Sequence, residues 1–332
     1  MNFLRAFFVS LGLLGALAVA AAPAAPRPVE RIAANGRAYL RVSDWARTHE
    51  LSSSWLVPGK TLQLAGGGNR LWLTLDSPGI RFNDIRLYLS LPVAGRDGAL
   101  YLAELDAARA LEPLLNPPRL PVGRKVRTIC LDPGHGGRDS GNQEAGRQEK
   151  QFTLLLAKEL RTQLAQRGFK VVMTRGTDTY VDLPERPKAA ARAHADLFVS
   201  LHFNAVATGK GAVRGAETYC LTPAGASSTN ARGVGAETGG YPGNRFNAQN
   251  VWLACKIQSA LLDTLKTDDR GVRRARFAVL RDATMPAVLV EAGFMSHPAE
   301  GQKIFSTAYR QQMARAIADG IVAYKKTVER PG

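Results

Sequence analysis

The sequence is poor in cysteine, in acidic residues and in long hydrophobic runs. Its 332 residues include three cysteines and no Cys-x-x-Cys pair, which disfavours a metal site built from cysteines. One long apolar stretch lies at the amino terminus. The rest of the chain lacks further apolar stretches long enough to span a membrane, which excludes a multi-span membrane protein. A hydrophobic content of 45% and a charged content of 22% exclude a disordered chain.

Acidic residues are scarce relative to basic ones. The 28 Asp and Glu residues face 44 Lys and Arg residues, which gives a formal charge of +16. A surplus of this size implies an anionic partner, which composition alone leaves open between nucleic acid, anionic lipid and an acidic wall polymer.

The amino terminus indicates export. Residues 1–25 place Arg5 before an apolar run and end in small residues with Ala-x-Ala sites, which is the layout of a signal peptide. An uncleaved anchor helix is the alternative, although the run is shorter than the roughly 20 residues that span a bilayer. We therefore expect a periplasmic or extracellular protein with no transmembrane segment in the mature chain, which disfavours nucleic acid as the partner.

Cys130, Cys220 and Cys255 each lie inside an apolar segment. An odd number in an exported protein leaves at least one thiol unpaired. The apolar surroundings favour three buried thiols, with one disulfide as the alternative.

Two blocks follow the signal. Residues 28–115 alternate apolar and polar positions between Gly-rich or Asn/Asp turns (RAYLRV, RLWLTL, ALYLAEL), which predicts a small, mostly antiparallel β domain with short helices at 42–50 and 103–115. This block weakly resembles the copper-amine-oxidase-like N-terminal domain. Its single histidine and lack of a metal-ligand cluster argue against copper binding.

A Pro-rich linker at 116–123 separates this block from residues 124–326. Here strands alternate with helices, which predicts an α/β domain with a mixed, largely parallel sheet and helices on both faces. We expect helices at 150–167, 184–195, 250–265 and 300–326. The segments FAVLR (277–281) and PAVLVEAGF (286–294) are expected as the last strands.

Candidate reactive groups lie where the strands of this second block end. His135 lies in a Gly-rich loop after one strand, His202 ends a second strand and Glu291 ends a third, while Glu149 begins a helix. Ligand sites of open α/β sheets gather at the carboxyl edge of the strands. An isolated histidine at a strand end is more often an ordinary polar residue than a metal ligand, so spacing alone does not establish a metal site. A phosphate loop is disfavoured because no GxGxxG or GK[ST] pattern follows.

His135, Glu149 and His202 form a plausible zinc set, since a catalytic zinc takes three protein ligands and one water. Glu291 would then accept the water proton and pass it to a leaving amine. Asp132 is a candidate for orienting His135.

Six collinear motifs between residues 127 and 324 make this region similar to the type 3 N-acetylmuramoyl-L-alanine amidase family of zinc-dependent cell-wall hydrolases. The motifs are LDPGHGGRDSG, QEKQFTLLLAKEL, VVMTRGTDTYVDLPER, ADLFVSLHFNA, GAETYCL and DRGVRRARFAVLRDATMPAVLVEAGFMSHPAE. The resemblance implies Zn²⁺ bound by His135, Glu149 and His202, with Glu291 as the catalytic residue. The implied substrate is peptidoglycan, cut at the amide between N-acetylmuramic acid and L-alanine.

Three further residues are candidates for supporting the site or contacting the substrate. Asn204 lies near His202, and Arg273 and Arg274 belong to the densest basic run. This run fits binding of peptide carboxylates, binding of an anionic envelope polymer or a solvated face equally well.

Residues 222–250 lack a helical apolar period, so we expect a loop and no inhibitory helix over the site. A zinc peptidase on wall stem peptides and an inactive wall-binding protein remain alternatives. No pattern indicates an oligomeric state.

Overall fold

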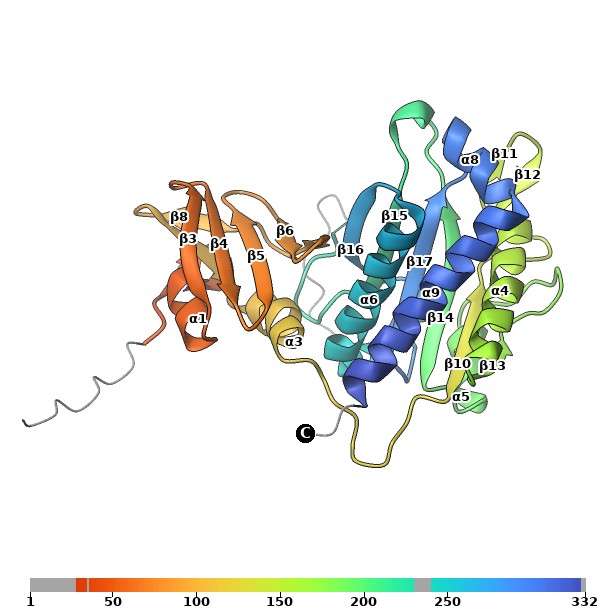
Figure 1. Ribbon diagram of the computed structural model, residues 1–332, viewed down its shortest axis with the longest axis horizontal. Coiled ribbons are helices and arrows are strands. Elements are labelled where there is room, and N and C mark those ends of the chain that lie inside the picture. The colour runs from red at the N-terminus through yellow and green to blue at the C-terminus, as the bar shows by residue number, and fades with distance from the viewer. Residues whose placement is uncertain (1–27, 35, 230–239, 330–332) are drawn as a thin grey trace, which may run out of the picture.

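The computed structural model describes residues 28–34, 36–229 and 240–329. The predicted signal peptide (1–25) and part of the 222–250 segment lie outside these residues. One mixed sheet dominates the molecule (Figure 1). Its strands are β3 (Ser52–Val57), β4 (Thr61–Gly66), β5 (Asn69–Thr74), β6 (Gly79–Phe82), β7 (Ile85–Tyr88), β10 (Thr128–Pro133), β13 (Lys170–Met173), β14 (Leu197–Asn204), β15 (Ala216–Leu221), β16 (Asp269–Ala275) and β17 (Ala287–Phe294).

These strands follow the order β13-β10-β14-β17-β15-β16-β7-β6-β5-β4-β3. Strands β13, β10, β14 and β17 are parallel, while β15 pairs with β17 in the antiparallel sense and with β16 in the parallel sense. Apolar side chains fill one face of β14 (Leu197, Val199, Leu201 and Phe203), whereas the other face carries Phe198, Ser200, His202 and Asn204. The predicted α/β fold class is confirmed, and the carboxyl ends of β10, β14 and β17 meet at one edge.

Helices cover both faces of this half of the sheet. Three long helices pack together on one face: α4 (Glu149–Gln166), α6 (Asn247–Leu265) and α9 (Thr307–Val328). The second face is covered by α5 (Glu185–Arg192) and α7 (Ala278–Arg281), which bury a smaller apolar cluster. The helix expected at 300–326 is two helices, α8 (Pro298–Phe305) and α9, because the backbone of Ser306 is extended between them.

One strand prediction was wrong. FAVLR contains α7, and the neighbouring basic run forms β16 in its place. Such a short apolar run has no period that separates a strand from a helical turn. In β16, Val272 is buried while Arg270 and Arg273 are half-buried, so a strand rich in arginine fits inside the sheet.

The amino-terminal block adds a second, antiparallel sheet, which confirms its predicted β character. Its elements are β1 (Arg31–Ala34), β2 (Arg37–Arg41), β8 (Ala94–Arg96), β9 (Ala99–Ala103), α1 (Val42–Thr48), α2 (Glu104–Asp106), the π-helical turn η1 (Ala107–Leu111) and α3 (Glu112–Leu115). Minor elements elsewhere are β11 (Gln143–Glu144), β12 (Arg147–Gln148) and the 3₁₀ turns η2 (Lys210–Ala212) and η3 (Pro242–Phe246).

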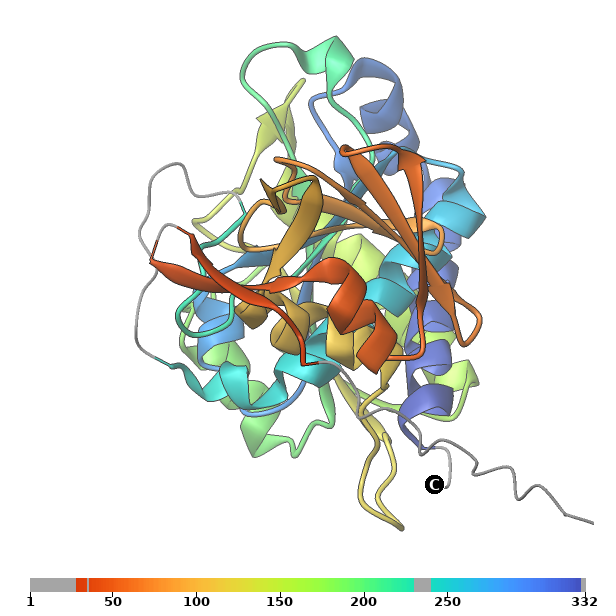
Figure 2. The same ribbon diagram turned by 90° about the vertical axis from the view of Figure 1, so that its left-hand side faces the viewer.

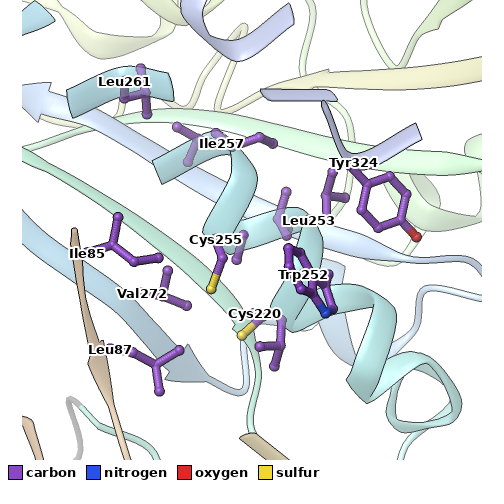
Figure 3. Close-up of a cluster of buried hydrophobic side chains, with 14 of the residues drawn as sticks. Ile85, Leu87, Cys220, Trp252, Leu253, Cys255, Ile257, Leu261, Val272 and Tyr324 are labelled. Carbon is purple, nitrogen blue, oxygen red and sulfur yellow. The ribbon is translucent and has the colours of Figure 1, made fainter. Parts of the chain in front are cut away.

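The two blocks share one sheet and one core. Leu87 of β7 pairs with Val272 of β16, and this contact joins the antiparallel strands β3–β7 to the parallel half. Figure 3 shows Ile85, Leu87 and Val272 facing Cys220 and Cys255 beneath α6. The amino-terminal strands therefore extend the sheet of the second block.

Segment 116–127, which contains the predicted linker, has no helix or strand and loops below both blocks in Figures 1 and 2. Polar contacts also cross the junction, since Trp252 Nε1 donates to the carbonyl of Pro113. The division into two domains at 116–123 stays a prediction. No helix within the described ranges has the length and apolar character needed to cross a membrane.

All three cysteines are buried and unpaired, as their apolar surroundings predicted. Burial, with a smaller effect from Asp132, raises the pKa of Cys130 to about 12. Burial also raises the pKa values of Cys220 and Cys255. A thiol that is both buried and protonated is a poor nucleophile.

We therefore expect the folded protein to resist alkylation at mildly alkaline pH, whereas all three thiols are modified in denaturant. Counting the labels by mass spectrometry checks this. A Ser54→Cys variant, with its thiol on the exposed strand β3, should label rapidly while folded and serves as the control. Rapid labelling of the unsubstituted folded chain would contradict the burial of the thiols.

Candidate active site

His135, Glu149 and His202 come together at the carboxyl edge of the sheet. Nε2 of His135 lies 3.1 Å from Oε2 of Glu149, and Nδ1 of His202 lies 2.9 Å from Oε1 of the same carboxylate. One ligand atom from each residue falls within 4.8 Å of the others. Three residues far apart in the sequence thus offer two imidazoles and a carboxylate to one point.

The glycines of the His135 loop make this approach sterically accessible. A Cβ atom on Gly134 would lie 2.3 Å from Cε1 of His202, and one on Gly141 would lie 2.5 Å from Cδ2 of His135. His135 itself has a positive φ of 61°, which turns the chain sharply after β10. The loop composition therefore follows from the need to bring two rings beside one carboxylate.

Glu149 is buried at the first position of α4, where a carboxylate is favoured by the helix dipole. Its oxygens accept hydrogen bonds from the backbone N–H groups of Asn142 and Phe203 and from the Asn142 side chain. Burial alone would raise the pKa of Glu149, but the hydrogen bonds and charge of His135 and His202 hold it well below its usual range. The carboxylate is therefore ionised.

The carboxylate that contacts Nδ1 of His135 belongs to Asp139, in place of the predicted Asp132. Oδ2 of Asp139 lies 2.9 Å from Nδ1 of His135, which leaves Nε2 facing Glu149. The Asp132 side chain is buried below the loop and accepts hydrogen bonds from Thr174, Ser200 and Arg186. Its side chain is directed at these partners because residue 132 still belongs to β10.

Asp132 acts on the site through Arg186. Nη1 of Arg186 lies 2.9 Å from Oδ1 of Asp132, and both side chains are almost completely buried. Nη2 of the same guanidinium donates to the carbonyl oxygen of His135. The ion pair therefore anchors the backbone that carries His135. Arg186 lies in the VDLPER motif, but nothing in the sequence indicated this role.

Glu291 lies beside the cluster on β17, in register with His202 on β14. The residue is half-buried, and its Oε2 atom is buried without a hydrogen-bond partner among the residues described. Burial raises the pKa of Glu291 well above its usual value, and the negative charges of Glu149 and Glu217 add to this effect. A carboxyl group in this environment can both accept and return a proton.

Glu217 is a part of the site that sequence reasoning missed. It is buried on β15 directly opposite Glu291 in the sheet. Its carboxylate forms ion pairs with Nε of Arg270 at 3.2 Å and of Arg273 at 3.0 Å. Asn204 donates to the same carboxylate at 2.8 Å. Its place in the GAETYCL motif was the only signal available.

The two predicted arginines have different surroundings. Arg273 is paired with Glu217 near the site and stacks on Tyr88. Arg274 is buried and donates to the carbonyl groups of Leu221 and Arg109. Substrate contact by Arg274 is therefore contradicted, because alternation along β16 turns its side chain to the opposite face of the sheet.

The cluster lies in an open hollow of about 390 Å³. Its lining combines the polar groups of the cluster with apolar residues, of which Leu183 and Phe277 are exposed. The donor set fits a metal ion, because two histidines, one carboxylate and open space beside them match a catalytic zinc site. Asp139 supports the fit by holding His135 from its second ring nitrogen.

Comparison with known proteins agrees with this geometry. The model of the N-acetylmuramoyl-L-alanine amidase family matches residues 129–323, more than half of the chain. The chain belongs to this family of hydrolases. The matched region contains His135, Glu149, His202 and Glu291 and excludes the amino-terminal block. The family resemblance that the motifs suggested is confirmed.

Individual relatives carry the same description. The chain is 37% identical over 197 residues to N-acetylmuramoyl-L-alanine amidase LytC of Bacillus subtilis, covering 59% of this chain and 35% of LytC. It is 36% identical to AmiC of Neisseria meningitidis, covering 68% of this chain and 58% of AmiC. This chain thus spans about a third of the length of LytC and just over half of the length of AmiC. A Clostridium difficile amidase structure superposes with a TM-score of 0.52 and 33% identity, covering 61% of this chain and 99% of that one.

The buried pair of Arg186 and Asp132 makes a testable contribution to stability. Arg186→Met leaves the Asp132 charge buried without its cation, so the free energy of unfolding should fall by about 3–5 kcal/mol. Urea denaturation measures the loss. Arg192→Met on the same helix removes an exposed ion pair and should cost about 1 kcal/mol or less. Equal losses in the two variants would contradict the role of the buried pair.

Proposed function

We propose that this protein hydrolyses the amide bond between N-acetylmuramic acid and L-alanine in peptidoglycan in a zinc-dependent reaction. The observation that carries the proposal is the convergence of His135, Glu149 and His202 beside Glu291. Membership of the amidase family supports the choice of peptidoglycan as substrate. The zinc requirement and the identity of the cleaved amide are the finer parts of the proposal.

His135, Glu149 and His202 would hold the metal. A bound zinc polarises a carbonyl oxygen and lowers the pKa of its water to about 7. Asp139 keeps Nδ1 of His135 engaged, and the amide groups around Glu149 hold its carboxylate. These contacts fix the donor atoms before a ligand arrives, which lowers the cost of assembling the site.

We propose that Glu291 transfers a proton from the attacking water to the leaving nitrogen. Amide hydrolysis forms a C–O bond from water to the lactyl carbonyl carbon and breaks the C–N bond to L-alanine. The water proton passes to Glu291 and then to the departing nitrogen, which leaves as a free amine. A raised pKa suits this role, because the same group must accept the proton and give it up again near neutral pH.

We place this reaction in the cell envelope, after export directed by residues 1–25. The basic surplus suits a surface made of anionic wall polymers. The hollow is open and its lining includes the exposed side chains of Leu183 and Phe277, which suits a polymeric substrate. A peptidase acting on stem peptides would use the same water activation and differ in the bond cleaved.

Product analysis tests the reaction. Digestion of purified peptidoglycan should release stem peptides with a free amino-terminal L-alanine and leave glycan strands without peptide. Labelling of new amino groups followed by mass spectrometry identifies both products. Cleavage of internal peptide bonds alone would replace the proposal with a wall peptidase, and absence of any cleavage by the metal-loaded protein would leave a wall-binding role.

Substitutions in the cluster separate metal binding from proton transfer. Glu291→Gln should lower kcat by about 10²–10⁴-fold and keep zinc at the stoichiometry of the unsubstituted protein, because residue 291 is not among the proposed ligands. His202→Ala should lose both zinc and activity. Elemental analysis and turnover assays provide the two readouts. A Glu291→Gln variant with full activity would exclude the assigned mechanism.

A further inference from the structure

A second hollow, of about 450 Å³, lies on the amino-terminal strands. Trp72 of β5, Arg81 of β6, and Arg86 and Tyr88 of β7 line it together with Asp269 of β16. It is thus built mainly by the amino-terminal block and completed by the block that carries the active site. The family match does not include the strands that form most of it.

Sheet register places these side chains on one face. Trp72 pairs with Arg81, and Arg81 pairs with Arg86, so the three side chains form a row across β5, β6 and β7. Leu71 and Leu87, at alternate positions, point into the core. The row therefore faces away from the core that Figure 3 shows beneath α6.

The sheet face that carries Trp72, Arg81 and Arg86 continues across the neighbouring strands to the candidate active site. Leu87 pairs with Val272, so the next residues along, Tyr88 and Arg273, share the opposite face, where the Arg273 guanidinium lies 4.3 Å from the Tyr88 ring centroid. Arg273 in turn binds Glu217, which lies opposite Glu291. Four strand spacings of about 4.8 Å place β7 roughly 19 Å from β14, which carries His202.

A β-bulge in β16 shapes the junction between β15, β16 and β7. The register between β15 and β16 shifts by one residue, since Ala216 pairs with Asp269 and Glu217 pairs with Gly271. Arg270 is the extra residue, which lets both Arg270 and Arg273 reach Glu217. Gly271 has a φ of 89°, and a Cβ there would lie 3.0 Å from the Tyr88 ring. The bulge therefore leaves room for Tyr88 beside the arginine pair.

The hollow offers two guanidinium groups and aromatic faces to solvent, with the exposed Asp84 carboxylate also in its lining. Arg81 and Arg86 are exposed, and the Arg86 guanidinium makes no hydrogen bond or ion pair with any residue in the described ranges. Arg81 lies over Trp72 at 5.9 Å. Guanidinium groups recognise carboxylates in a bidentate manner, and half-buried aromatic rings present apolar surface beside them.

We propose that this hollow is a second subsite for the substrate, which binds a carboxylate-bearing sugar–peptide unit of the same strand that enters the active site. The inference rests on the proposed function. The active site holds the unit being cleaved, and the Trp72–Arg81–Arg86–Tyr88 hollow holds a neighbouring unit along the shared sheet face. The amino-terminal block thereby increases affinity for polymer without taking part in the chemistry.

Two substrates of different length test this. The Arg81→Gln/Arg86→Gln variant should raise KM about tenfold on soluble glycan strands that carry stem peptides and leave kcat unchanged. Turnover of a single disaccharide–peptide unit should stay at the level of the unsubstituted protein, because one unit does not span both sites. Both arginines are exposed, so thermal unfolding should be unaffected.

A matched variant controls for bulk charge. Lys158→Gln/Arg161→Gln removes the same two charges from exposed positions on α4, which covers the other face of the sheet. This variant should change KM on strands by less than twofold. Equal effects of the two double variants, or an equal loss on the single unit, would overturn the subsite. Failure of the unsubstituted protein to cleave either substrate would instead reject the proposed function.

Discussion

Parallel pairing of β14 with β10 and β17 is the constraint on which the site depends. It brings the loop after β10 beside the end of β14 and sets His202 opposite Glu291. A register change of one residue in either pair would turn His202 or Glu291 to the other face of the sheet. On one face of β14, Leu197, Val199, Leu201 and Phe203 pack into the core, and their burial holds that register.

The surroundings of Glu149 and Glu291 then shift the pKa values of these two carboxyl groups. Glu149 is ionised inside the protein because two imidazoles and three amide hydrogen bonds compensate for its desolvation. The buried Oε2 atom of Glu291 has no such partner among the residues described, so burial, together with the charges of Glu149 and Glu217, moves the pKa of Glu291 in the opposite direction. Two glutamates of the candidate site therefore have opposite pKa shifts because their environments differ.

The arginine-rich strand β16 links this chemistry to the amino-terminal block. Arg274 reaches the carbonyl of Arg109, while Arg273 lies between Glu217 and Tyr88. Part of the basic surplus is thus used inside the fold. The same strand lets the sheet continue from the candidate site into β7, so the face of β5–β7 that carries Trp72, Arg81 and Arg86 lies on the same side of the sheet as Glu217.

Pattern alone predicted the alternating order of the second block and the β character of the first, and the ordered motifs singled out His135, Glu149, His202 and Glu291 as site candidates. Strand periodicity and ordered motifs are local properties, so a single chain displays them. Tertiary structure decided that FAVLR is helical, that Arg274 is buried, that Asp139 rather than Asp132 contacts His135 and that Glu217 faces Glu291. Each of these depends on which distant strands pair and which face a side chain takes, and neither is set by neighbours in sequence.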